Sequence, residues 1–124
     1  MINKAKYSIS VENQKGTSKL FVDDDEISTY PLKSVIYPVD YGSIKGYIGE
    51  DGDDLDIFIG SGELAGYIKV WRLDVPEEVK FFIQVTPKEV EEIKAAFKPV
   101  LLACEVLSDE SFEEKIEKYK KNSQ

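Results

Sequence analysis

The chain has 124 residues, 42% hydrophobic and 32% charged, so we expect one soluble domain, residues 1–124, with a hydrophobic core. Its net charge of −8, from 24 acidic and 16 basic residues, argues against a nucleic-acid partner and against binding to an anionic membrane surface. The absence of histidine excludes a histidine-dependent triad and a histidine-ligated zinc site. The sequence has no membrane-spanning apolar run, no signal-like N-terminus and only one cysteine, Cys104, so we expect a cytoplasmic protein.

The predicted elements begin with a series of strands. In chain order these strands cover residues 6–12, 18–22, 34–48, 55–60, 66–74 and 79–85. The first two are expected to pair as a hairpin, and the polar segment 23–33 is expected to be a loop. Pro38, Gly42 and Gly46 interrupt the third segment, which predicts a curved strand and not a helix.

The last third of the sequence contains two predicted helices. In TPKEVEEIKAAF, Thr86 is a suitable N-cap and Pro87 occupies the first helical position, which predicts a helix over 87–98. A strand over 100–107 is expected to bury Cys104 in the core. A second helix over 109–121 has lysines at its C-terminal end, where they complement the helix dipole. Strands followed by late helices favour a small curved antiparallel sheet or barrel with helices packed on one side.

The stretch DGDDLDIF, residues 51–58, places four aspartates next to a predicted strand. Carboxylates this close repel one another and raise each other's pKa unless a cation lies among them. One interpretation is a solvated Asp-Gly turn. The other is a cation site, in which a turn near Gly52 brings Asp51, Asp53 and Asp56 together. The stretch lacks the glycine and final glutamate of an EF-hand, whereas clustered carboxylates suit magnesium.

A second motif, YPVDYGSI, precedes this cluster at residues 37–44. The pair YPVDYG and DGDDLDIF resembles the signature of the soluble, magnesium-dependent inorganic pyrophosphatases, in which a YPxNYG-like strand precedes DGDPLDVLV. The similarity extends, in order, to KYSIS, LFVD, WRLDVPEEVKFFIQV and VEEIKAAFKPV, so it covers most of a chain that is shorter than usual. The resemblance implies a mainly β (α+β) fold: a small closed OB-like antiparallel β-barrel of five to six strands with two helices packed on it.

The resemblance also implies a function, namely hydrolysis of inorganic pyrophosphate, or a related small phosphoanhydride, by a water that magnesium activates. The residues that match family metal ligands are Asp51, Asp53, Asp56, Asp74 and Glu78. Those that match catalytic positions are Asp53, which would accept the proton of the attacking water, Tyr41 and Lys80. Those that match substrate-binding positions are Lys6, Tyr37 and Lys98. We also expect a homo-oligomer.

Each of these residues also has an ordinary structural interpretation. The tyrosines could fill the core, the lysines could be surface residues, and Asp74 could cap a turn.

Three departures from the family pattern weaken the expected binding of phosphate. Ser8, Asp24 and Phe97 stand where the family has a glutamate, a phosphate-binding arginine and a phosphate-binding tyrosine. An aspartate in place of an arginine reverses a charge and removes a bidentate donor. Lys33 and Arg72 are the two candidate substitutes. Besides an enzyme of reduced activity, two alternatives stay open. One is a degenerate relative that binds metal or phosphate without turnover, and the other is an interaction module whose acidic face binds a basic partner protein.

Overall fold

A computed structural model of the chain describes residues 1–21, 30–73 and 75–121. The elements in chain order are η1 (Lys4–Lys6), β1 (Ile9–Asn13), β2 (Ser18–Leu20), β3 (Ser34–Ile36), β4 (Asp40–Ile48), β5 (Asp54–Ile59), β6 (Leu64–Val70), β7 (Glu78–Val85), α1 (Pro87–Ala96), η2 (Lys98–Val100), β8 (Leu101–Leu107) and α2 (Asp109–Glu117). Asp24 and Asp74, both named from the sequence, lie outside the described residues. No helix in the described ranges has the length and apolar character needed to cross a membrane.

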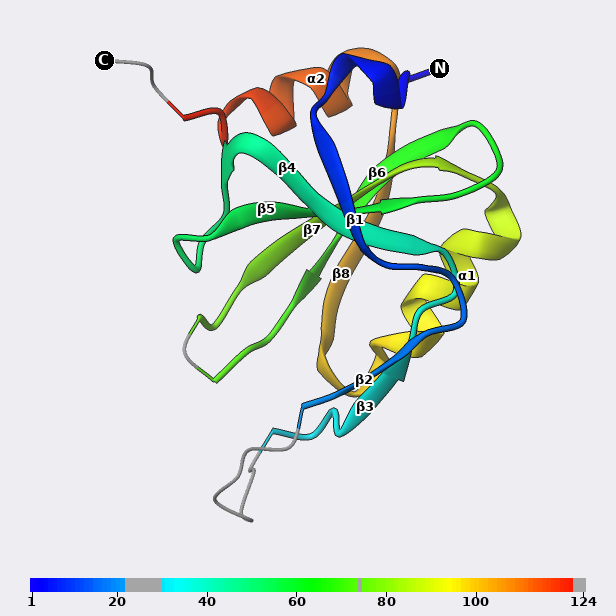
Figure 1. Ribbon diagram of the computed structural model, residues 1–124, viewed down its shortest axis with the longest axis vertical. Coiled ribbons are helices and arrows are strands. Elements are labelled where there is room, and N and C mark those ends of the chain that lie inside the picture. The colour runs from blue at the N-terminus through cyan, green and yellow to red at the C-terminus, as the bar shows by residue number, and fades with distance from the viewer. Residues whose placement is uncertain (22–29, 74, 122–124) are drawn as a thin grey trace.

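Six strands form one sheet in the order β1-β4-β5-β7-β6-β8, and β2 and β3 form a separate two-stranded sheet (Figure 1). The predicted mainly β fold with two helices is therefore confirmed. One neighbouring pair differs from the expected antiparallel arrangement, because β5 and β7 run parallel, with Ile57 opposite Phe81. Within the described residues no hydrogen-bonded ladder joins β1 to β8, so hydrogen bonds do not close the sheet into a barrel.

The predicted hairpin between residues 6–12 and 18–22 is wrong. The strand β1 pairs with β4, and β2 pairs with β3. The turn between β1 and β2 is hydrogen-bonded to the backbone of Tyr37. The Tyr37 carbonyl accepts from the Gly16 amide, and the Tyr37 amide donates to the Thr17 carbonyl. The strand β1 approaches β4 closely at Gly42, where any Cβ atom would collide with the carbonyl of Ser10. The pairing of β1 is thus decided by a strand distant in sequence.

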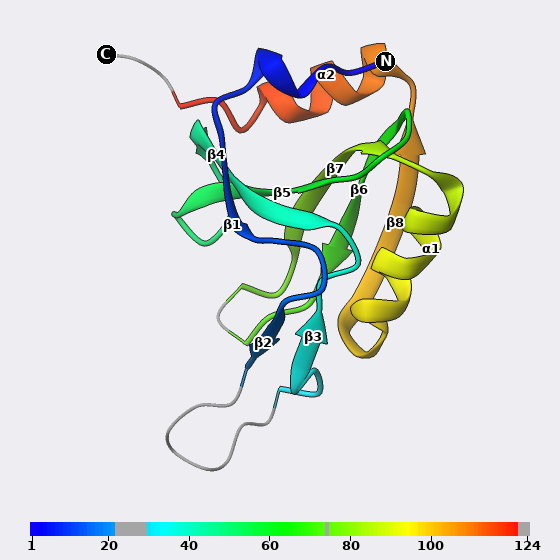
Figure 2. The ribbon, with the colours of Figure 1, turned by 45° about the vertical axis from the view of Figure 1, so that its right-hand side comes forward.

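The central strands β5 and β7 are apolar on both faces over residues 57–59 and 81–83, because each face of the sheet is covered there. One face packs against α2 through Ile57, Phe81, Ile83, Phe112 and Ile116. The other packs against α1 through Phe58, Phe82, Val90 and Ile93. The two helices therefore lie on different sides of the sheet and not on one side, as Figure 2 shows.

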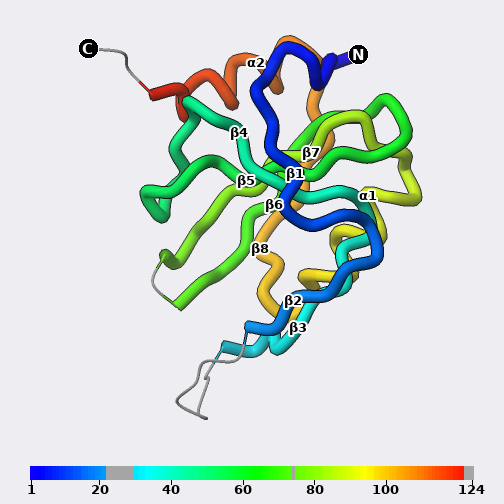
Figure 3. Tube along the Cα trace, in the orientation of Figure 1, coloured from blue at the N-terminus to red at the C-terminus, as the bar shows by residue number. Residues whose placement is uncertain are grey.

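The helix α1 begins as predicted, because Thr86 and Glu89 form a reciprocal capping box. It ends at Ala96, and Phe97 is its C-cap residue. At the opposite end of the molecule from the β2–β3 hairpin, α2 lies beside η1 (Figure 3). Ion pairs from Met1 to Asp109 and from Lys6 to Glu113 join the two segments. Cys104 is half-buried in β8, so the expected buried cysteine is only partly covered.

Candidate metal and phosphate site

A cavity of about 700 Å³ lies beside β4 and β5, close to the turns that connect β4 to β5 and β6 to β7. Five carboxylates and three cationic side chains line it together with aromatic residues, so its wall is highly charged. The lining residues are Glu12, Asn13, Lys19, Phe21, Tyr30, Tyr37, Tyr41, Ser43, Asp51, Gly52, Asp53, Asp54, Asp56, Arg72, Lys80 and Phe97. Its volume falls within the range of small-molecule sites in proteins.

The turn before β5 carries the aspartates into this cavity. Gly52 has a φ of +85°, which glycine adopts without strain, and its amide donates to the carbonyl of Gly49 over 3.0 Å. Asp51 closes the turn, because its Oδ1 accepts a 3.0 Å hydrogen bond from the amide of Asp53. Asp51, Asp53, Asp54 and Asp56 all line the cavity as a result. The stretch is both a turn and part of a charged site.

Lys80 of β7 lies at the buried end of this charge network. Its Nζ is 2.8 Å from Asp56 Oδ2, 2.7 Å from Glu78 Oε1 and 2.7 Å from the Tyr41 hydroxyl. Only 9% of its side chain is exposed. An ammonium group excluded from water in this way is tolerated because anionic and hydroxyl oxygens replace its hydration.

The protonation states follow from burial and from these contacts. Burial alone would lower the pKa of the Lys80 ammonium, but Tyr41, Asp56 and Glu78 raise it well above its ordinary value. Burial alone would raise the pKa of the Asp56 carboxyl, but Lys80 lowers it below the ordinary value. The pKa of Glu78 is raised by burial, which Lys80 only partly offsets. Burial also raises the pKa of Tyr41 well above its ordinary value, so its hydroxyl is protonated.

Arg72 extends the network toward solvent. Its Nη1 lies 3.2 Å from Asp51 Oδ2 and 2.6 Å from Glu78 Oε2, so one guanidinium nitrogen bridges two carboxylates. The Glu78 side chain is 2% exposed, whereas that of Arg72 is 36% exposed. Alternating charges thus run from Asp51 through Arg72, Glu78 and Lys80 to Asp56.

The carboxylate of Glu78 is enclosed by these two cations. Its Oε2 binds Arg72, but its buried Oε1 accepts no hydrogen bond from the described residues. The 2.7 Å approach of Lys80 to Oε1 is therefore an ion pair without hydrogen-bond geometry. Glu78 is therefore balanced by two cations but lacks part of the hydrogen bonding expected of a buried carboxylate.

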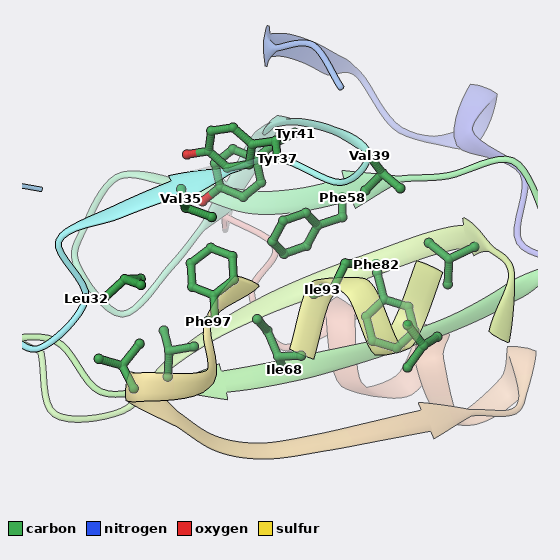
Figure 4. Packing of buried hydrophobic residues seen from close by; sticks show 14 of the residues in the cluster. Leu32, Val35, Tyr37, Val39, Tyr41, Phe58, Ile68, Phe82, Ile93 and Phe97 are labelled. Atoms are coloured by element: carbon green, nitrogen blue, oxygen red, sulfur yellow. The ribbon is translucent and has the colours of Figure 1, made fainter. Parts of the chain in front are cut away.

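Aromatic rings form the apolar part of the cavity wall (Figure 4). The rings of Tyr37 and Tyr41 are stacked with centroids 4.7 Å apart, and Phe58 and Phe97 lie close to them. Lys80 Nζ lies 5.2 Å from the Tyr41 ring centre and 5.9 Å from that of Phe97. Tyr37 and Tyr41 therefore contribute both to the core and to the cavity. Phe97 is 2% exposed and has no hydroxyl to offer a ligand.

Not every residue named from the sequence reaches this cavity. Lys6, Lys98 and Ser8 are not among its lining residues, and Lys6 forms a 2.9 Å ion pair with Glu113 of α2. The predicted metal ligand Glu78 does not line the cavity either and contacts it only through Arg72 and Lys80. Of the two proposed substitutes for the family arginine, Arg72 lines the cavity and Lys33 does not.

Six lining residues were not named from the sequence, namely Glu12, Asn13, Lys19, Phe21, Tyr30 and Ser43. Glu12 and Asn13 come from the end of β1, Lys19 from β2, and Ser43 from β4, where it lies opposite Asp56. Ser43 stands two residues after Tyr41, and alternation along one strand face could have indicated it. The position of Lys19 depends on the unexpected pairing of β2 with β3.

The sequence profile described as Inorganic Pyrophosphatase matches residues 2–82, which is more than half of the chain. The chain belongs to the inorganic pyrophosphatase family. Comparison with curated proteins finds no significant match. In this pyrophosphatase-family chain the matched residues include the aspartate cluster, Tyr37, Tyr41, Arg72 and Lys80, whereas Phe97 and Lys98 lie beyond the match.

The donors of the cavity fit a hard divalent ion. Carboxylate oxygens are the ligands that magnesium prefers, and five carboxylates line the cavity. In the described ranges, however, no three acidic side chains are arranged to hold a metal ion. The arrangement differs from a preformed metal cage because Arg72 and Lys80 already lie against Asp51, Glu78 and Asp56.

Proposed function

We propose that the protein hydrolyses inorganic pyrophosphate to two phosphates in a magnesium-dependent reaction. The observation that carries this proposal is the location of the family aspartates, which line a charged cavity together with Tyr41 and Lys80. The cavity has more carboxylates than cations, so by itself it repels a multiply charged anion. A divalent ion resolves this conflict, because it can lie between the carboxylates and the phosphate oxygens.

The candidate metal ligands are Asp51, Asp53, Asp56 and Glu78, together with Asp74 outside the described residues. Magnesium would neutralise the phosphoryl oxygens and make the attacking water more acidic. Asp53 is exposed at the cavity wall, where its carboxylate can accept the proton of that water. The reaction then needs no histidine.

The cations of the site have separate tasks in this proposal. Lys80 keeps Asp56 ionised and orients Tyr41, and its burial between two carboxylates suits charge balance better than direct contact with a phosphate. Lys19 is exposed on the lining and is the better placed lysine for binding a phosphate. Lys6 and Lys98, proposed from the resemblance, would have to act from outside the cavity.

Release of phosphate from pyrophosphate tests the proposed activity. We expect turnover with magnesium, loss of turnover with a chelator and recovery when magnesium is restored. Asp53→Asn keeps the size of the side chain but removes the proton acceptor, so kcat should fall by about 10²–10⁴-fold with the fold intact. Asp54→Asn removes the same charge from the neighbouring residue and should change kcat only a few-fold. Equal losses in both variants would refute the role of Asp53.

A second candidate is a family member that binds metal or phosphate without turnover. Two observations favour it, namely the absence of a hydroxyl on Phe97 and the pairing of the candidate metal ligands with Arg72 and Lys80. Wild-type protein that binds magnesium and pyrophosphate but releases no phosphate would establish this alternative.

A further inference from the structure

Arg72 occupies a position that the proposed function assigns to a metal ion. Its Nη1 bridges Asp51 Oδ2 and Glu78 Oε2 at 3.2 and 2.6 Å. A divalent ion bound between these two carboxylates would compete with the guanidinium for the same narrow space and the same negative charge. The two cations disfavour each other there, since a metal ion and a guanidinium repel each other and each needs direct contact with oxygen.

The guanidinium cannot leave this position by losing a proton, because arginine stays charged at any ordinary pH. It can leave only by moving. Its backbone is held, since the Arg72 amide donates to the Val75 carbonyl and the neighbouring Trp71 amide donates to Val100. The side chain is 36% exposed, so its long flexible stem has a path to solvent.

The burial of Glu78 explains why Arg72 does not leave without a replacement. Its side chain is 2% exposed, and its Oε2 would lose its charged donor if Arg72 moved away without replacement. Lys80 would then remain as its only counterion and is already shared with Asp56, so the loss of Arg72 from this buried carboxylate is disfavoured. Departure of Arg72 is therefore coupled to arrival of another cation at the same carboxylates.

We propose that Arg72 is an internal counterion that holds Asp51 and Glu78 in the metal-free protein and is exchanged for magnesium when the ion binds. This inference rests on the proposed magnesium-dependent function. It means that magnesium binding must also supply the free energy that displaces Arg72 from the two carboxylates. Arg72 thereby sets the magnesium concentration at which the site is filled.

Calorimetric titration of chelator-treated full-length protein with magnesium tests the exchange. Arg72→Gln keeps an amide donor for Glu78 but removes the competing charge, so we expect magnesium to bind at least about tenfold more tightly. Lys69→Gln is the matched control. It removes a charge from neighbouring β6, whose 3.9 Å ion pair with Glu77 does not involve Asp51 or Glu78, and should leave the affinity within about twofold.

Three results would overturn the inference. An unchanged affinity in Arg72→Gln would show that no exchange takes place. A weaker affinity would show that Arg72 arranges the carboxylates for the ion. An equal gain in Lys69→Gln would show a general effect of charge. In each case the wild type still binds magnesium and the proposed function stands, whereas absence of magnesium binding in wild type and variants alike would remove both.

A second measurement needs no substitution. Arg72 is the only arginine of the sequence, so isotope-labelled arginine gives the NMR signals of a single guanidinium. In the metal-free protein its charge-assisted hydrogen bonds should slow rotation of the guanidinium nitrogens and keep their signals distinct. Magnesium should release the group and average these signals. Unchanged signals at saturating magnesium would overturn the exchange.

Discussion

Lys80 is the residue that permits two carboxylates to remain charged in the interior. It lies against Asp56, Glu78 and Tyr41, and only 9% of its side chain is exposed. Removal of one member of a buried ion pair leaves the other charge without compensation, and this costs more free energy than the pair itself contributes. The stability of the protein should therefore depend on Lys80 far more than on its surface lysines.

We expect Lys80→Met to lower the free energy of unfolding by about 3–5 kcal/mol at neutral pH, because Asp56 and Glu78 lose their shared counterion. Urea unfolding measures this loss. Lys69→Met removes a lysine that is 32% exposed and pairs over 3.9 Å with an exposed Glu77, so its effect should stay below about 1 kcal/mol. Comparable losses in the two variants would contradict the role given to Lys80.

The residues of the site divide into those that local sequence indicates and those that it does not. The aspartates and Tyr41 belong to short motifs, and all of them line the cavity. Arg72 was named only as one of two substitutes, because its contact with Glu78 depends on the course of the chain between β6 and β7. Lys19 was not named, since its place follows from pairing of β2 with β3 and not with β1.

At the scale of elements, the N-terminus of α1 is fixed by Glu89. Its Oε1 accepts from the amides of Ser61 and Thr86 at 3.0 and 2.8 Å, and its Oε2 accepts from the Ser61 hydroxyl at 2.9 Å. This carboxylate joins the turn after β5 to the helix. Burial alone would raise the pKa of Glu89, but these hydrogen bonds lower it below the ordinary value. The ionised form therefore stabilises the folded state.

Glu89→Gln should lower the free energy of unfolding by about 1–2 kcal/mol at neutral pH, because the charge-assisted hydrogen bonds are weakened. Since the pKa of Glu89 is lowered on folding, its contribution is present above the unfolded pKa of about 4.3 and is lost as pH falls through the folded pKa. The difference between wild type and variant should thus shrink below about pH 4.

Denaturant unfolding at a series of pH values measures this dependence. Glu92→Gln, on the exposed side of the same helix, should change stability by less than about 0.5 kcal/mol at every pH. A difference between wild type and Glu89→Gln that persists unchanged at low pH would refute the account of the cap.

The capping box of α1 could be predicted because its residues are adjacent in sequence. The pairing of β2 could not, because the short connection to β1 suggested a hairpin whereas the backbone of its turn bonds to Tyr37. Strand identity is thus a local property, but strand partnership is decided by tertiary contacts.

At the scale of the whole molecule, the sheet is covered by α2 on one face and by α1 on the other (Figure 1). The charged cavity lies beside the turns at one end of its strands. The parallel pairing of β5 and β7 places Lys80 on the same face as Asp56, where their 2.8 Å contact forms. The order of strands in the sheet could not be predicted from their sequences. The mainly β fold could, because the elements themselves were clear.

The central claim is that this cavity hydrolyses pyrophosphate with magnesium and does not only bind it. Phosphorus NMR of pyrophosphate with the wild-type protein separates these outcomes in one sample, because binding broadens the pyrophosphate signal and hydrolysis replaces it with that of orthophosphate. We predict replacement by orthophosphate when magnesium is present and none when it is chelated. A pyrophosphate signal that persists at full intensity, broadened or not, throughout incubation with magnesium would contradict the claim.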